Sequence, residues 1–120
     1  GLWFKFIHAH MNIKQLIKHQ LDFDKEEGFN NNKPHDLDDL TFNSIAISGE
    51  LGEFLNLVKK KIRKEKYGKL REDEEEISEE ELKEELVDVF IYFLKICAIL
   101  DIDIEEEYFK KLEKVKSRFK

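Results

Sequence analysis

Four acidic residues in apolar surroundings are the clearest candidates for chemistry in this sequence. Glu50 and Glu53 lie three residues apart in an apolar stretch, and Glu85 and Asp88 repeat that spacing in the most hydrophobic stretch of the chain. On a helix, residues three apart project from neighbouring positions of one face. A carboxylate among apolar side chains must be paired or must bind a metal, because its charged form is otherwise strongly disfavoured. We therefore predict that the four carboxylates face one another across two helices.

The ligand types favour a hard divalent cation. Carboxylate oxygens without histidine in the same stripes suit Mg²⁺, with Mn²⁺ as the alternative. The Glu-x-x-His motif of di-iron bundles is absent, and one cysteine, Cys97, provides no thiolate pair for zinc. A purely structural alternative is that the acids form salt bridges with Lys59, Lys60 or Lys95 across the bundle.

Magnesium bound by a few carboxylates keeps positions open for water and for substrate phosphate. It can then polarise a phosphoryl oxygen and activate water for in-line attack, either as one ion or as a pair. The sequence contains no GxxxxGK[ST] loop, so backbone amides are not expected to cradle the phosphates. We expect the metal and lysine side chains to hold them instead.

The composition indicates that helices position these acids. The chain has 120 residues, of which 41% are hydrophobic and 40% are charged, with one proline and five glycines. Abundant Glu and Lys with few breakers predict an all-α, four-helix-bundle-like single domain. Apolar periodicity and candidate caps place the helices at about residues 12–24, 37–64, 79–100 and 104–119. The third is apolar nearly all round, so we expect it to be central, with Cys97 in the core.

Two features between these helices bear on the site. Residues 66–77 form a polar connection, and the acidic run Glu72–Glu76 within it predicts a solvated loop. Gly49 and Gly52 interrupt the second helix at a cost of roughly 1 kcal/mol each relative to alanine. They are either tolerated weaknesses or places where another helix or a ligand approaches closely.

Charge and cysteine use limit the partners. The formal net charge is -6, and clustered basic residues occur only near Lys59–Lys64, which argues against nucleic acid as the main partner. No apolar run reaches the roughly 20 residues that span a bilayer, so no membrane association is expected. One cysteine suits a reducing cytoplasm. Residues 1–10 are interpreted as a leader derived from cloning, with Met11 as the natural start and residues 11–120 as the domain.

The acidic pairs and their flanks resemble a known family. Ser48–Phe54 (SGELGEF), followed after a polar connection by Glu84–Val89 (EELVDV), is similar to the MazG-like members of the all-α nucleoside triphosphate pyrophosphohydrolases. The ending from Lys111 to Phe119 resembles the last helix of that family. The resemblance spans residues 12–119.

The resemblance implies hydrolysis between the α- and β-phosphates of a (deoxy)nucleoside triphosphate, giving monophosphate and pyrophosphate. It implies Mg²⁺ bound by Glu50, Glu53, Glu85 and Asp88, and assembly as a dimer or tetramer. Any of the four carboxylates could deprotonate the attacking water. For substrate we predict phosphate contacts from Lys60, Lys95 and Lys111, with Tyr92 lining the site and Phe23 or Phe29 either stacking on the base or capping the core.

Two alternatives remain open at this point. One is a sister enzyme with a similar bundle and chemistry, phosphoribosyl-ATP pyrophosphohydrolase. The other is a non-catalytic helical interaction protein whose acids only form salt bridges. Stabilisation of the fold by Mg²⁺ would separate a metal site from salt bridges.

Overall fold

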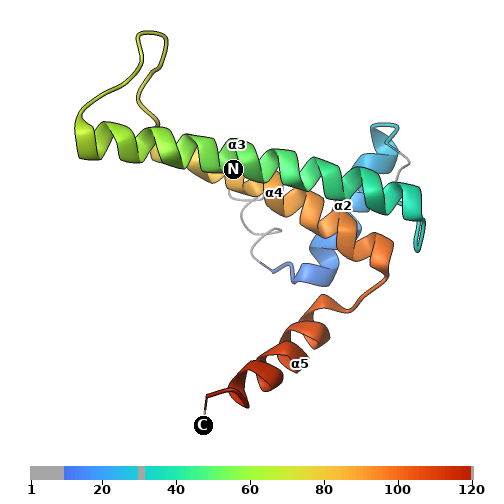
Figure 1. Ribbon diagram of the computed structural model, residues 1–120. Coiled ribbons are helices and arrows are strands. Elements are labelled where there is room, and N and C mark those ends of the chain that lie inside the picture. Colours follow the sequence, from blue (N-terminus) through green and yellow to red (C-terminus); the bar gives the residue numbers. More distant parts are fainter. Residues whose placement is uncertain (1–9, 30–31, 120) are drawn as a thin grey trace. The chain divides into compact units, whose positions relative to one another are not determined.

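The computed structural model describes residues 10–29 and 32–119, and within them the chain is all-helical. This part of the chain contains four helices and no strand (Figure 1): α2 (Ile13–Glu26), α3 (Leu37–Tyr67), α4 (Glu79–Leu100) and α5 (Ile104–Lys116). The predicted all-α class is confirmed. Apart from His10, the proposed leader lies outside the described residues.

Local sequence determines where each helix begins. A side-chain oxygen immediately before each first turn accepts a hydrogen bond from a backbone N–H three residues later, which satisfies a donor that the helix cannot pair internally. The capping residues are Asn12, Asp36, Ser78 and Asp103. Gly28 and Gly68 follow the ends of α2 and α3 with φ of 85° and 66°, which are values that glycine adopts without strain.

The described residues group into two units. One holds the described residues up to Leu40 together with those from Leu94 onward, and the other is Thr41–Phe93. In the first unit α2 contacts α5. Its buried apolar side chains are Leu94, Cys97 and Ile99, all on the last turns of α4, so the expected core position of Cys97 is confirmed.

A buried acid joins three segments of the first unit. Asp24 on α2 is 1% exposed. Its carboxylate accepts hydrogen bonds from Gln20 and Asn32 at 2.9 and 2.6 Å, and the ammonium of Lys95 on α4 lies 3.3 Å away. Every acceptor oxygen therefore has a donor, which is the condition for burying a carboxylate.

The second unit consists of the facing parts of α3 and α4 and the connection between them (Figure 1). No apolar side chain in Thr41–Phe93 is buried, and large ones such as Leu55, Leu86 and Phe90 are 53%, 52% and 37% exposed. The expectation that α4 is central, with partners on several sides, is therefore wrong for its first half within this unit. Within this unit only α3 lies beside it, and one neighbour cannot cover a helix that is apolar all round.

None of the helices within the described residues combines the length and the apolar character that crossing a bilayer demands. This finding agrees with the absence of long apolar runs in the sequence.

Replacing Asp24 by alanine tests the buried ion pair. We expect Asp24→Ala to lower the free energy of unfolding by about 3 kcal/mol, because Lys95 would keep its charge in a largely desolvated position. Asp22→Ala on the same helix removes an exposed ion pair with Lys18, and should cost about 0.5 kcal/mol or less. Urea denaturation measures both, and equal losses would show that the buried pair has no special role.

Candidate metal centre

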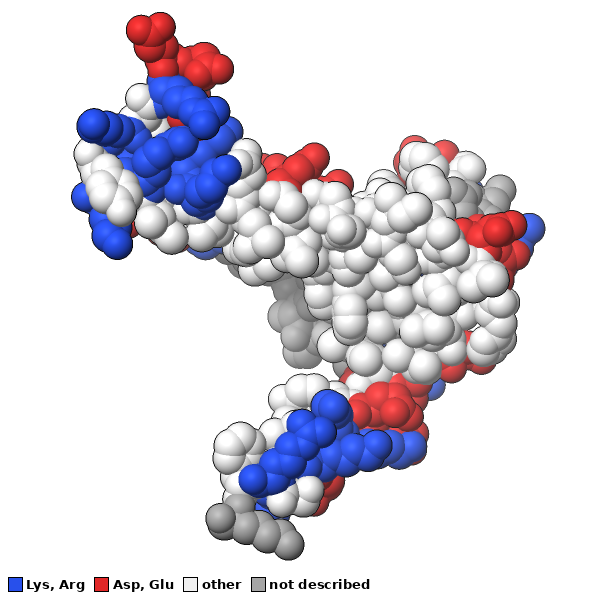
Figure 2. Space-filling view, in the orientation of Figure 1, with Lys and Arg blue, Asp and Glu red and all other residues white. Residues whose placement is uncertain are grey.

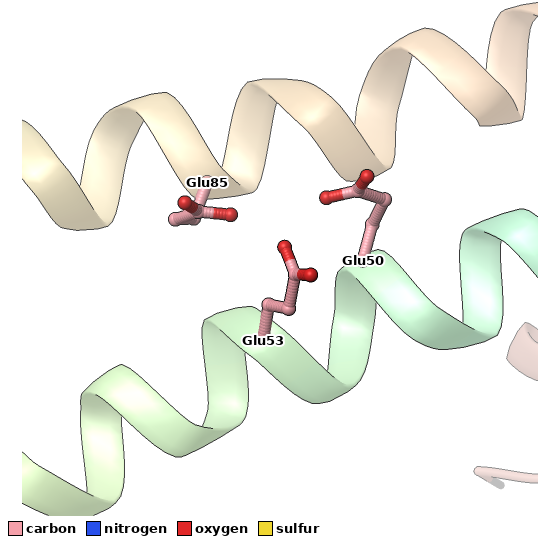
Figure 3. Close-up of side chains that lie close together, drawn as sticks. All are labelled: Glu50, Glu53 and Glu85. Carbon is pink, nitrogen blue, oxygen red and sulfur yellow. The ribbon is translucent and has the colours of Figure 1, made fainter.

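Three of the four predicted carboxylates come together between α3 and α4. Glu50 and Glu53 project from α3 toward α4, and Glu85 projects from α4 toward them (Figure 3). One carboxylate oxygen of each lies within 4.8 Å of the others. Oxygens at such separations can ligate one divalent cation, since magnesium–oxygen bonds are about 2.1 Å long.

The electrostatics of this acidic triad (Glu50, Glu53 and Glu85) are unfavourable without a cation. Burial raises the pKa of Glu50, and the neighbouring charges of Glu53, Asp88 and Glu85 raise it further. Burial also raises the pKa of Glu85, followed by the charges of Asp88 and Glu53. Oε2 of Glu50 and Oε2 of Glu85 are both buried and have no hydrogen-bond partner within the described residues. A bound cation would satisfy these two oxygens, because they accept no hydrogen bond and lie in a negative environment.

Asp88 lies one turn after Glu85 on α4, outside the group of mutually close oxygens. Its side chain is half-buried, and its negative charge raises the pKa of both Glu50 and Glu85. Asp88 therefore adds negative potential to the triad, while its role as a direct ligand stays a prediction.

The salt-bridge alternative requires a lysine close to the triad. Instead, the ion pair of Lys60 is with Glu74 at 3.8 Å, and that of Lys95 is with Asp24 at 3.3 Å. Within residues 10–29 and 32–119, no ion pair joins Glu50, Glu53 or Glu85 to a basic side chain. Among the described residues, no ion pair therefore neutralises these acids.

The predicted phosphate contacts are distributed over both units. Lys60 is half-buried on α3, seven residues after Glu53 and hence on nearly the same face. Lys95 and Lys111 belong to the other unit. Lys95 is largely buried beside Asp24, whereas Lys111 is exposed on α5 between other charged residues.

The predicted aromatic contacts also differ in position. Tyr92 is half-buried on α4, seven residues after Glu85 and so on the same face. Phe23 and Phe29, in the first unit, are 48% and 56% exposed. Both rings are thus about half exposed, and capping of the core and stacking on a base both stay predictions.

Gly49 and Gly52 have open space around them. A Cβ atom built on either would meet no other atom within 4 Å. Within the described residues nothing packs closely against these glycines, and the approach of another helix or of a ligand there stays a prediction. The same observation leaves the surface of α3 beside Glu50 and Glu53 accessible.

One group that the sequence analysis did not single out is Glu74. The acidic run Glu72–Glu76 was expected to be solvated, and this is wrong for Glu74, whose side chain is 8% exposed. Arg63 and Lys60 on α3 surround its carboxylate. Nothing in the order of residues separates Glu74 from the acids beside it, so no sequence signal could have found it.

Comparisons with protein-family models, with curated proteins and with solved structures find no match for this chain. The site must therefore be judged on its own chemistry. Its three carboxylates fit a hard divalent cation, since two of their buried oxygens accept no hydrogen bond and no ion pair neutralises them within the part of the chain that the structure describes.

Removing the charge of Glu50 should change how stability depends on pH. A carboxyl whose pKa is raised by folding stabilises the protein most below its unfolded value near 4.5, and this contribution is lost as pH rises through the folded pKa. In chelator, we expect the melting temperature to fall between about pH 5 and pH 8 more steeply for the unmodified protein than for Glu50→Gln.

Bound magnesium should offset the loss of stability that the unmodified protein shows at high pH. With excess Mg²⁺ at about pH 8, the unmodified protein should melt a few degrees higher than in chelator, and Glu50→Gln should gain less. Glu81→Gln, which changes an exposed acid about one turn before Glu85 on α4, serves as the matched control. Identical pH profiles for Glu50→Gln and Glu81→Gln would contradict the assignment.

Proposed function

We propose that this protein is a Mg²⁺-dependent nucleotide pyrophosphohydrolase, with Mn²⁺ able to replace magnesium. It cleaves the α–β phosphoanhydride of a (deoxy)nucleoside triphosphate to monophosphate and pyrophosphate. The observation that carries the proposal is the acidic triad of Glu50, Glu53 and Glu85, whose oxygens lie within 4.8 Å of one another. The likeness of Ser48–Phe54 and Glu84–Val89 to the MazG-like enzymes supports the choice of reaction.

The triad residues have different proposed roles, because their exposure to solvent differs. Glu50 and Glu85 each have a buried oxygen without a donor and are the principal cation ligands, with Glu53 completing the set. A divalent cation bound there supplies charge stabilisation for the phosphoryl oxygens and lowers the pKa of a bound water. Glu53 is exposed, so it is the triad member best placed to accept a proton from a water molecule arriving from solvent.

Assays with a panel of ribo- and deoxynucleoside triphosphates test the function. We expect pyrophosphate release that requires Mg²⁺ or Mn²⁺. Glu53→Gln should lower kcat/KM roughly 100-fold or more, because an amide is a poorer ligand and cannot accept a proton. Asp88→Asn should reduce it as well, through the weaker negative potential at the site.

Glu81→Gln on an exposed turn of α4 should retain full activity. Release of pyrophosphate from phosphoribosyl-ATP alone would favour the sister enzyme. Hydrolysis of none of these nucleotides with either metal, or full activity in Glu53→Gln, would overturn the proposal.

The second unit also supports assembly of copies of the chain as a dimer or tetramer. Leu51, Leu55 and Ile62 lie along one side of α3, and Leu86, Phe90 and Phe93 lie along one side of α4. From their exposed fractions of 36–53%, these six side chains offer roughly 500 Å² of apolar surface. Two such surfaces bury about 1,000 Å², which reaches the lower limit for a specific interface, so a second copy is a sufficient partner.

Sedimentation tests this assembly. The unmodified protein should sediment as a dimer or larger, and Leu55→Glu should shift it toward a species of the 14.4 kDa chain mass, because a charge would be buried without a partner. Asn56→Glu, at the adjacent exposed position, should leave the assembly intact. A monomeric unmodified protein at micromolar concentration would contradict the expectation.

A further inference from the structure

A single acid fastens the connection between α3 and α4 to the end of α3. Glu74 accepts two hydrogen bonds from Nη2 of Arg63, both at 2.7 Å, and one from the backbone N–H of Arg71 at 2.8 Å. The ammonium of Lys60 lies 3.8 Å from the same carboxylate. The acids on either side of Glu74 in the connection are exposed, so the burial is specific to this side chain.

The donors around Glu74 form an anion-binding set. A guanidinium and an ammonium that converge on one carboxylate are also the groups that bind a phosphate. Nε of Arg63 is buried and has no acceptor within the described residues. A carboxylate offers two oxygens and leaves this donor unused, whereas a phosphate offers more oxygens to the same donors.

This anion-binding set lies on the same helix as the acidic triad. Lys60 follows Glu53 by seven residues, which places it on nearly the same face of α3 about 10 Å further along the axis. Figure 2 shows basic side chains gathered over the C-terminal end of α3 and acidic ones at the protruding tip of the adjoining connection.

The remaining attachments of the connection are weak. The ammonium of Lys64 lies 4.0 Å from the exposed Glu76. The ammonium of Lys61 donates a long hydrogen bond of 3.4 Å to the carbonyl oxygen of Ile77 and lies 3.9 Å from the exposed Glu79 at the start of α4. Exposed pairs of this length contribute little free energy. Hydrogen bonding from the backbone of Arg71, then the charges of Arg63 and Lys60, lower the pKa of Glu74 and keep it ionised. A polyanion that competes for Arg63 and Lys60 would thus meet one main obstacle, Glu74.

We propose that Lys60 and Arg63 bind the polyphosphate end of the substrate, and that Glu74 is an internal competitor that occupies them until the substrate arrives. The connection between α3 and α4 is then a strap that a polyphosphate opens. This assignment rests on the proposed function for the identity of the substrate. The anion site itself requires neither a metal nor hydrolysis.

Binding of inorganic tripolyphosphate in EDTA tests the competition. Calorimetry should show roughly tenfold tighter binding to Glu74→Gln than to the unmodified protein, because the competing charge is gone. Glu75→Gln makes the same charge change at an exposed neighbour and should alter the affinity by about twofold or less. Arg63→Gln introduced into Glu74→Gln should abolish the gain. Equal affinities of Glu74→Gln and Glu75→Gln would overturn the proposal.

A second measurement uses the unmodified protein and so does not depend on how a variant folds. Tripolyphosphate should accelerate trypsin cleavage after Lys69 or Arg71, which lie in the strap, with a peptide substrate controlling for effects on trypsin itself. Unchanged or slower cleavage would contradict the opening of the strap. Because no divalent ion is present, these experiments can fail while the nucleotide assays succeed, and the reverse. Failure of the anion site is therefore distinguishable from failure of the proposed hydrolysis.

Discussion

Repulsion among three carboxylates between two helices is the constraint on which the rest of this structure depends. Glu50, Glu53 and Glu85 approach within 4.8 Å of one another, and burial and mutual repulsion raise the pKa of Glu50 and Glu85. The unit that contains them buries no apolar side chain of its own to offset that cost. A divalent cation would remove the repulsion and would be ligated by the oxygens that accept no hydrogen bond, so the folded arrangement and the proposed chemistry have the same requirement.

The contrast with other buried acids shows why the triad is the candidate site. Asp24 is buried, but two side-chain amides and Lys95 surround it. Glu74 is buried, but Arg63, Lys60 and a backbone N–H surround it. Both acids hold segments of the chain together. Among the described acids, Glu50 and Glu85 of the triad are the ones with a buried oxygen that accepts no hydrogen bond, and such unbalanced groups are characteristic of functional sites.

Local features of the sequence predicted much of this structure. The third helix was predicted with its observed bounds and the other three to within about three residues, because caps such as Ser78 and Asp103 and the glycines after α2 and α3 act over single turns. The meeting of Glu50, Glu53 and Glu85 was also predictable. Their apolar neighbours distinguish them from the many acids that lie in polar surroundings.

What the sequence did not reveal depends on contacts between distant residues. The pairing of Asp24 with Lys95 and that of Glu74 with Arg63 join positions 71 and 11 residues apart, and no local pattern encodes either one. The apolar pattern of α4 predicted a central helix with partners on several sides, but it could not show whether those partners belong to this chain. In the same way, the sequence could not show that the space around Gly49 and Gly52 is open within the described residues.

Crystals of the full chain grown with Mn²⁺ would test the central claim most directly. Manganese scatters anomalously, so its position can be found without assuming any ligand. We expect an anomalous peak between α3 and α4, within bonding distance of oxygens from Glu50, Glu53 and Glu85. The absence of a peak among these three carboxylates, in crystals where manganese is bound elsewhere or not at all, would contradict it.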